Sequence, residues 1–443
     1  MRSVAVLGLP IVVNQASFAL MQFTDAWIAG RLGGTALAAI GPAAVLASIL
    51  SVCGLEALTS VTAQVSQSIG KGRPALAGLV TWQGIYCGAL FGWACLIYYP
   101  TAGVIFPFLF RDQSPALVAF EVEYFQVSLL GLAPLMIATA IGNFFTGLGR
   151  PRFVMAAALV GVLANLIFSW GFTFGAFGFS AMGFKGIAWG TVLATLIQSL
   201  VLIAFFLIPQ DLRGTYGTLR AGFSKKRCWK LLKTGIPAGI HGGVDYLAWA
   251  FVLTWLISFS GESHLAAQSI VVRCISLSFL PAEGMASALA TLVGAAVGAR
   301  DYLLARRYTQ SALMLIIIWM TSMALIYFLF AEEILRLFTQ DEAIIAAGRT
   351  AMLWVAAFQF FDALNVTYSN ALQGAGDTAW PSVVNVTISL VVLLGGGLAV
   401  VTFLPGFASS GVWAAATLYV VAHGVIFHFR WAGRAWQQRR FIE

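Results

Sequence analysis

Five carboxylates interrupt the long apolar runs of this sequence and are its first candidates for chemistry: Asp25, Glu56, Asp245, Glu283 and Asp362. A charged carboxylate is costly to bury in an apolar medium unless a partner group, water or a bound cation compensates its charge. Acids in such places can take up and release a proton or a metal cation. The pattern therefore indicates ion binding.

Two of these acids recur in the sequence and the others do not. Glu56 and Glu283 are 227 positions apart and occupy equivalent places in the second apolar run of each half. A symmetric pair favours the same structural task performed twice, such as bonding a neighbouring helix. Asp245 and Asp362 have apolar residues at the equivalent first-half positions. This asymmetry favours a specific binding site in the second half. Asp245 and Asp362 could bind Na⁺ or a proton there.

One cation lies in an apolar run as well, Arg273 in the stretch "SIVVRCISLSF". We expect it to be the charge partner of Asp245 or Asp362, which leaves the other acid able to bind H⁺ or Na⁺. Alternatively, it only locks neighbouring helices together. His241 precedes Asp245 by one helical turn, so it either hydrogen-bonds this acid or packs as a satisfied histidine.

The composition indicates which elements must position these residues. Of 443 residues, 60% are hydrophobic and 9% are charged, whereas soluble domains carry about 25% charged residues. The apolar runs are about 20 or more residues long, enough for a helix to cross a bilayer, and they lack the alternation of barrel strands. The sequence therefore predicts an all-α polytopic membrane protein and excludes a soluble one.

Twelve membrane-spanning helices fit these runs best. The first run is too long for a cleavable signal peptide and lacks a small-residue cleavage pattern. The expected spans are 4–29, 36–68, 78–107, 118–147, 152–176, 186–208, 231–259, 264–297, 308–331, 343–373, 381–403 and 411–430.

Lysine and arginine predict the orientation of these spans. With the N-terminus inside, most of the 25 Lys and Arg residues fall in inner segments, including Arg439 and Arg440 of the C-terminal tail. Both termini are thus expected to be cytoplasmic, in the inner (cytoplasmic) membrane of the cell. The net charge of +8 follows from basic loops beside an anionic leaflet, so no nucleic-acid partner is expected. The five cysteines lack metal-ligand spacing and are interpreted as structural free thiols.

The chain repeats itself about a hydrophilic linker at residues 209–230, which is expected to be cytoplasmic. "GLP" at 8–10 recurs as "GIP" at 235–237, and "NFFTGLG" recurs as "NALQGAG", again 227 positions later. The expected domains are an N-terminal six-helix bundle, residues 1–208, and a C-terminal bundle with a basic tail, residues 231–443. Because each half has an even number of helices, six, both halves enter the membrane from the same side and are parallel repeats. We expect them to surround a central cleft and to alternate access by rocking of one half against the other.

The sequence contains no Walker motif, no glycine-rich phosphate loop and no cluster of metal-ligand residues. Nor does it carry a nucleophile–base pair in its spans, so an enzyme is not expected. No cofactor is expected either, apart from H⁺ or Na⁺ as a coupling ion. An ion gradient, rather than nucleotide hydrolysis, would supply the energy.

The "GLP/GIP" starts, the run "TDAWIAGRLGGTALAAIG", the segment "ALQGAGDT" and the 6+6 repeat resemble the multidrug and toxic-compound extrusion (MATE) transporters along residues 6–430. The stretch "LAAQSIVVRCISLSFLPAEG", with its arginine, is more similar to the DinF-type than to the NorM-type branch. The resemblance implies an antiporter that expels amphipathic, mostly cationic organic compounds in exchange for H⁺ or Na⁺. A flippase for lipid-linked precursors, from the same superfamily, is the alternative; it would need more intramembrane cations than Arg273 alone.

The resemblance also implies site residues in the first half. Asp25 matches the family's helix-one acid, Asn165 the helix-five asparagine and Thr191 the helix-six threonine. Many DinF-type members carry an aspartate four residues after that asparagine, where this sequence has Ser169. A first-half site would then contain one carboxylate instead of two.

In the second half, Asp245 falls where NorM-type members carry a helix-seven acid, and Asp362 falls on their helix-ten aspartate. Asp25, Asp245 and Asp362 are therefore expected to couple ion and substrate fluxes by competition for the same negative charge. The expected partners are small organic substrates, the coupling ion and membrane lipids, and a monomer is expected.

Overall fold

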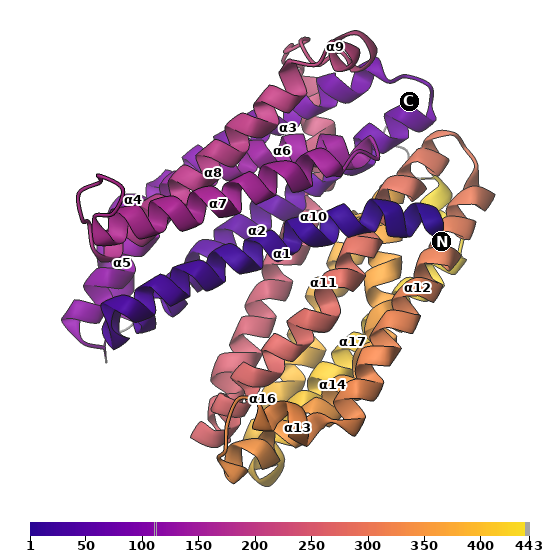
Figure 1. Cartoon of the computed structure of the whole chain (residues 1–443). Coiled ribbons are helices and arrows are strands. Elements are labelled where there is room, and N and C mark those ends of the chain that lie inside the picture. Colours follow the sequence, from indigo (N-terminus) through magenta and orange to yellow (C-terminus); the bar gives the residue numbers. More distant parts are fainter. Residues whose placement is uncertain (110, 112, 439–443) are drawn as a thin grey trace. The chain divides into compact units, whose positions relative to one another are not determined.

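The structure, a computed structural model, describes residues 1–109, 111 and 113–438, with only the backbone described for residues 34–42, 254, 408 and 438 (Figure 1). Arg439 and Arg440 of the predicted basic tail lie outside the described residues. Within the described ranges every regular element is a helix. The predicted all-α fold is confirmed.

Nine α-helices form the first half of the chain. A 3₁₀ turn at Cys95–Ile97 connects α3 to α4. The helices are α1 (Arg2–Leu32), α2 (Gly34–Gly70), α3 (Ala75–Ala94), α4 (Tyr98–Leu109), α5 (Pro115–Leu130), α6 (Leu132–Gly147), α7 (Arg152–Phe174), α8 (Phe184–Leu207) and the short α9 (Gln210–Tyr216).

The second half continues with α10, which extends into a π-helical turn at Val252–Leu256. A second π-helical segment, Ser389–Gly395, connects α15 to α16, and 3₁₀ turns occupy Pro405–Phe407 and Ala435–Gln438. The helices are α10 (Lys225–Phe251), α11 (Glu262–Gly298), α12 (Tyr302–Leu329), α13 (Ala331–Arg336), α14 (Glu342–Ala375), α15 (Ala379–Ile388), α16 (Gly396–Phe403) and α17 (Ala408–Ala432).

Each expected span coincides with one helix or with consecutive helices. In the described part of the chain, 10 helical stretches are long and apolar enough to cross a membrane, and α5 with α6, bent by 44°, is an eleventh if the pair is one span. The expected span 231–259 corresponds to α10 and its π-helical turn, which also contain His241 and Asp245. The number of twelve crossings therefore stays a prediction.

The repeat is visible in the element order. α3 begins at Ala75 and α12 at Tyr302, 227 positions later, and the same interval separates the starts of α7 at Arg152 and α15 at Ala379. Two compact units can be distinguished, residues 13–239 and residues 1–12 together with 240–443. The domain boundaries expected from the sequence stay predictions.

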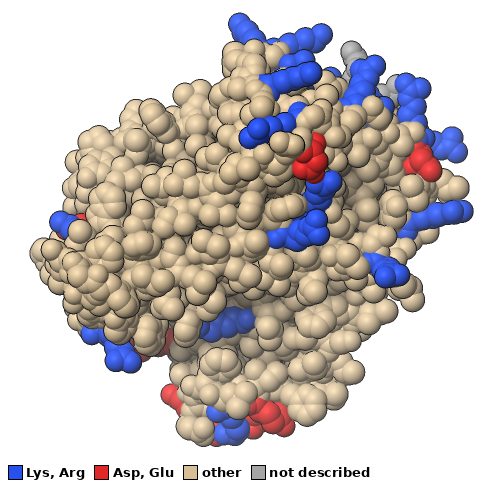
Figure 2. All heavy atoms as spheres, turned by 45° about the horizontal axis from the view of Figure 1, so that its top comes forward, with Lys and Arg blue, Asp and Glu red and all other residues tan. Residues whose placement is uncertain are grey.

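The outer surface of the helices is apolar. Leu90, Val104 and Phe403 are 72%, 73% and 79% exposed, as expected for side chains that contact lipid tails rather than water. Figure 2 shows wide areas of this face without charged side chains; Lys and Arg are most numerous in the upper part of the view, and others lie at its left and lower edges. This surface agrees with a membrane protein.

Glycines set how closely helices approach within the unit 13–239. α7 and α8 lie side by side (Figure 1). A Cβ atom at Gly190 of α8 would lie 2.3 Å from the backbone nitrogen of Ser169, and one at Gly186 would lie 2.5 Å from the nitrogen of Thr173. Only a residue without a side chain fits at these contacts. The two helices therefore touch backbone to backbone beside Ser169.

In the unit that contains residues 240–443, α14 packs against α11, α12 and α17. A Cβ atom at Gly374 would lie 2.3 Å from the carbonyl oxygen of Ala290, and one at Gly424 would lie 2.6 Å from that of Phe361. These close contacts fix α14, which carries Asp362, against α11 and α17.

Candidate functional site

Asp25 lies on α1 and is only 3% exposed. Thr191 Oγ1, from α8, donates a hydrogen bond of 2.7 Å to Asp25 Oδ2, and Asn165 Nδ2, from α7, donates one of 3.1 Å to Asp25 Oδ1. Hydrogen bonds to an ionised carboxylate are about twice as strong as neutral ones. Three helices thus meet at one buried acid.

Asn165 connects the members of this site to one another. Its Nδ2 atom also lies 2.9 Å from Thr191 Oγ1 and 3.2 Å from Ser169 Oγ. An amide nitrogen has two hydrogens, so these two hydroxyls and Asp25 compete for them. The Oδ1 atom of Asn165 has no hydrogen-bond partner among the described residues, although the side chain is fully buried. This oxygen is therefore an acceptor that a cation or a proton donor could use.

The sequence did not identify one member of this site, Tyr124 of α5. Its hydroxyl donates to Asp25 Oδ2 at 3.5 Å, and its side chain is 8% exposed. A tyrosine inside an apolar span was the only available signal, because a buried phenol usually has a hydrogen-bond partner. We call Asp25, Tyr124, Asn165, Ser169 and Thr191 the Asp25 cluster.

The Asp25 cluster contains the first-half residues that the resemblance implied, together with Tyr124. Ser169 Oγ donates to the Ile187 carbonyl at 3.3 Å, and Gly190 packs directly on Ser169. Around Asp25 the cluster offers carboxylate, hydroxyl, phenol and amide oxygens. Hard cations prefer such oxygen ligands, and a proton can bind the carboxylate itself.

A second polar network surrounds Asp245 of α10. The hydroxyl of Tyr419, from α17, donates to Asp245 Oδ1 and also lies 3.1 Å from Asn385 Oδ1, so two acceptors share one phenolic hydrogen. Asn385 Nδ2 donates at 3.1 Å to the backbone carbonyl of His241. Tyr419 and Asn385, 3% and 1% exposed, were not identified from the sequence.

Asp362 of α14 is the other acid of this half and is 8% exposed. Asn365 Nδ2, on the next turn of the same helix, donates to Asp362 Oδ1 at 3.2 Å. No hydrogen bond between Asp362 and Asp245 is present in the described structure, but the two carboxylates interact through their charges. A shared cation would relieve this repulsion.

Two histidines of this half, His241 and His423, lie beside this network. The described structure has no hydrogen bond between the His241 ring and Asp245, and the backbone carbonyl of His241 accepts from Asn385. His423, one turn after Tyr419, is 1% exposed and contacts the Tyr419 carbonyl through Nδ1 at 3.0 Å. Its Nε2 atom has no partner within the described residues.

Arg273 lies on α11, and its side chain is exposed. No ion pair within 4.0 Å joins it to Asp245 or Asp362 in the part of the chain that is described. The structure therefore does not bring the expected charge partner to the two acids. Its role as their counter-charge stays a prediction.

Glu283, one of the two repeated acids, has a polar neighbour on an adjacent helix. Asn370 Nδ2 of α14 lies 3.4 Å from both carboxylate oxygens of Glu283 on α11. Asn143, at the equivalent first-half position, donates to the Leu58 carbonyl at 2.9 Å. The contact of Glu283 with α14 agrees with a helix-bonding role, which stays a prediction for the pair.

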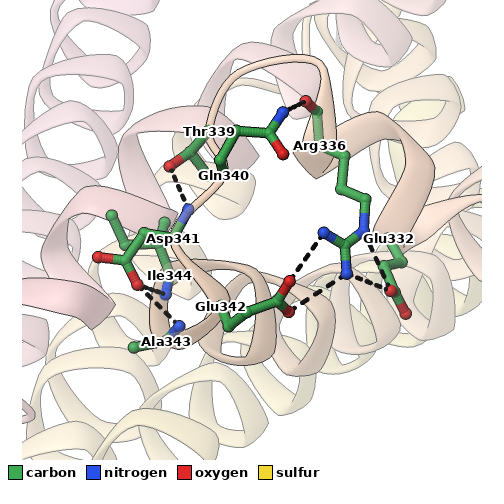
Figure 3. Close-up of polar contacts among 8 residues, drawn as sticks. All are labelled: Glu332, Arg336, Thr339, Gln340, Asp341, Glu342, Ala343 and Ile344. Carbon is green, nitrogen blue, oxygen red and sulfur yellow. Dashed lines mark hydrogen bonds and ion pairs between the residues drawn. The ribbon is translucent and has the colours of Figure 1, made fainter.

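The start of α14, far from Asp362 along the chain, is held by charged groups (Figure 3). Arg336 of α13 contacts Glu342 at 2.8 Å and Glu332 at 2.9 Å, and these two carboxylates raise the pKa of the Arg336 guanidinium. Asp341 Oδ1 accepts from the Ala343 backbone nitrogen at 2.8 Å and so caps the helix. Among the described residues there is no group of three or more His, Cys, Asp or Glu side chains that could hold a metal ion.

Comparisons with known proteins agree with this structure. A family model described as MatE matches residues 10–170 and 246–398, more than half of the chain. The chain is 26% identical over 441 residues to a protein of Chromobacterium violaceum named "Probable multidrug resistance protein NorM", covering 97% of this chain and 92% of the relative. A Bacillus subtilis protein of the same name is 27% identical over 431 residues, covering 96% and 93%.

A solved structure described as the outward-facing conformation of a multidrug resistance MATE family transporter of the MOP superfamily has the same fold. It aligns with a TM-score of 0.87 and 20% sequence identity, covering 99% of this chain and 96% of the other. The two relatives carry the NorM name, so the DinF-type branch stays a prediction. With a family model across both halves and a fold shared along nearly its whole length, the chain belongs to the MATE family of membrane transporters and is not an enzyme.

Proposed function

We propose that this transporter is an efflux antiporter, which expels amphipathic, mostly cationic organic compounds in exchange for H⁺ or Na⁺ by alternating access. The proposal places it in the inner membrane as a monomer with both termini cytoplasmic. The distribution of Lys and Arg supports this orientation of the termini. The names of its relatives, which describe multidrug resistance proteins, support the class of substrate.

The Asp25 cluster carries the proposal. Its carboxylate is 3% exposed, yet within the described residues its contacts are neutral donors and no lysine, arginine or histidine forms an ion pair with it. Neutral donors stabilise a buried negative charge only in part, because they bring no opposite charge. A proton or Na⁺ at Asp25 would supply that charge.

The second half offers a comparable arrangement at Asp245 and Asp362. Tyr419 and Asn365 donate to these acids, and the two negative charges act on one another. A cationic substrate and a coupling ion would compete for such acids, since each neutralises the same charge. Ion uptake would then release the substrate, and loss of the ion would prepare the transporter for the next one.

Dye efflux from proteoliposomes tests this function, with the pH gradient and the Na⁺ gradient imposed independently. We expect ethidium transport to follow one of the two gradients and to fall strongly in Asp25→Asn, Asp245→Asn and Asp362→Asn. Asp211→Asn, at an exposed position of α9, is the control and should transport normally. The proposal fails if all three variants are present at normal levels and still transport ethidium at the wild-type rate.

A further inference from the structure

The segment between α9 and α10, residues 217–224, lies along one face of α3. Trp82 Nε1 donates to the Thr218 carbonyl at 2.7 Å, and Gln83 Nε2 donates to the Gly222 carbonyl at 2.9 Å. The Ser224 backbone nitrogen in turn donates to Gln83 Oε1 at 3.0 Å. We call residues 217–224 the linker strap. Its backbone is thus bonded to side chains of α3 in a fixed register.

Two further contacts extend this register in both directions along α3. A Cβ atom at Gly78 would lie 2.5 Å from the Tyr216 carbonyl oxygen, so the chain passes directly over this glycine. One turn beyond Trp82, the Tyr86 hydroxyl donates to the Ala221 carbonyl. Contacts at positions 78, 82 and 86 follow the spacing of one helical face. The linker strap therefore delivers the first turn of α10 to a defined place on α3.

Two thiols meet at that place. The Sγ atoms of Cys87 on α3 and Cys228 in the first turn of α10 are 3.0 Å apart. Both side chains are half-buried, so small reagents can reach them. No other two cysteine sulfurs of the described structure are in contact. A disulfide needs its sulfurs about 2.05 Å apart, so only a small shift separates this pair from a covalent bond.

Metal binding fits this pair less well than a disulfide does. No third metal-ligating side chain accompanies the thiols in the described residues. Thiolates that share one zinc ion, with Zn–S bonds of about 2.3 Å, also lie further apart, at about 3.8 Å in a tetrahedral site. Two sulfurs already in contact favour direct bonding between them.

We propose that Cys87 and Cys228 form a reversible modification site, which closes to an intramolecular disulfide under oxidising conditions and staples the start of α10 to α3. With hydrogen peroxide as oxidant, one thiolate attacks a peroxide oxygen, the O–O bond breaks, and a sulfenic acid forms. The second thiolate attacks that sulfur, the S–O bond breaks and the S–S bond forms. In total two thiols and one peroxide yield one disulfide and two waters.

The reducing cytoplasm holds protein thiols reduced, so on the proposed orientation the bond forms only during oxidative exposure. Thiol–disulfide exchange with a reduced dithiol reverses it. The proposal does not depend on the transported substrate or on the coupling ion, because it concerns only the contact of the linker strap and α10 with α3.

Full-length protein in detergent, treated with hydrogen peroxide and then alkylated with N-ethylmaleimide after unfolding, tests the modification. Of the five cysteines, we expect all to be alkylated before oxidation and two fewer afterwards, with full recovery after dithiothreitol. Mass spectrometry of peptides should identify the Cys87–Cys228 link. Oxidation of the single thiols without a link, a link between other cysteines, or an unchanged thiol count would each overturn the proposal.

The stapling itself is measured by thermal unfolding, in a second experiment. Oxidised wild-type protein should unfold at least about 2 °C higher than reduced protein, because the cross-link restricts the unfolded chain. Cys87→Ser and Cys228→Ser should lose this difference, whereas Cys53→Ser is the matched control and should retain it. Equal shifts in all of these variants would exclude the disulfide as the cause.

Discussion

Thr191 donates a 2.7 Å hydrogen bond to Asp25, and its hydroxyl is also 2.9 Å from Asn165 Nδ2, so this one side chain joins α8 to both α1 and α7. A hydroxyl that donates to a carboxylate and accepts from an amide orients both groups. The geometry of the Asp25 cluster therefore depends on the hydroxyl of Thr191, which positions both Asp25 and Asn165.

Thr191→Val keeps the shape of this side chain and removes its hydroxyl. Loss of one hydrogen bond to a charged group corresponds to about 1.5–3 kcal/mol, so we expect ion-driven efflux to fall roughly tenfold or more. Thr191→Ser retains the hydroxyl and should transport at close to the wild-type rate. Initial rates of dye efflux under a fixed gradient measure both variants; equal rates for Val and Ser would contradict a role of the hydroxyl.

Gly190→Ala should separate α7 from α8 beside the Asp25 cluster. The added methyl group would lie 2.3 Å from Ser169, a distance that only movement of the backbone can relieve, and overpacking of this kind costs about 1–3 kcal/mol. We expect a lower unfolding temperature together with weaker efflux.

The control for Gly190→Ala is Gly103→Ala, in α4. No heavy atom lies within 4 Å of a Cβ built there, and alanine in a helix is favoured over glycine by about 0.5–1 kcal/mol. Its unfolding temperature should stay the same or rise. A fall of similar size in both variants would indicate a general intolerance of alanine rather than a specific helix contact.

Long apolar runs were sufficient to place the helices, because a membrane span must satisfy its backbone internally and is therefore helical over its whole length. The resemblance indicated four of the five residues of the Asp25 cluster. Tyr124 could not be found in this way, since a phenol on a neighbouring helix becomes a partner of Asp25 only once the helices are packed. For the same reason the linear sequence did not reveal that Tyr419 and Asn385 surround Asp245.

Arg273 shows why the sequence alone does not determine whether a cation within an apolar run is buried. Its position in an apolar run indicates a buried cation, but the rotation of α11 about its axis determines whether the guanidinium faces other helices or the surface. In the structure its side chain is exposed, while the next residue, Cys274, is 8% exposed. Hydrophobic periodicity determines such a rotation poorly in a helix that is apolar all round.

Tyr419→Phe should impair the second-half site while preserving the packing of its ring. It removes the hydroxyl that donates to Asp245 and contacts Asn385. The expected result is reduced substrate affinity or coupling, seen as a higher dye concentration for half-maximal efflux. Tyr246→Phe, one position after Asp245 in α10, is the comparison variant, because the described residues show no hydrogen bond from Tyr246. The assignment would be wrong if both substitutions had the same effect.

Two equivalent positions of the halves, Arg150 and Asp377, carry opposite charges, and each forms an ion pair. Arg150 contacts Asp211 at 3.1 Å, and Asp377, 227 positions after Arg150, contacts Arg430 at 2.7 Å. The side chain of Asp211 is 61% exposed and that of Asp377 is 1% exposed. Water therefore screens the first pair, whereas the second lies in a poorly hydrated environment.

Arg430→Ala removes the ion-pair partner of a buried carboxylate, a change that costs about 3–5 kcal/mol when a buried pair is broken. Arg150→Ala breaks an exposed pair and should cost at most about 1 kcal/mol. Thermal unfolding in detergent should thus show a clearly lower midpoint for Arg430→Ala and little change for Arg150→Ala. In the double variant Arg430→Ala with Asp377→Asn, much of the lost stability should return, because the buried side chain that has lost the Arg430 charge is then neutral. If the double variant were as unstable as Arg430→Ala alone, the cation–π contact of Arg430 with Trp380, at 4.8 Å, would be the larger contribution.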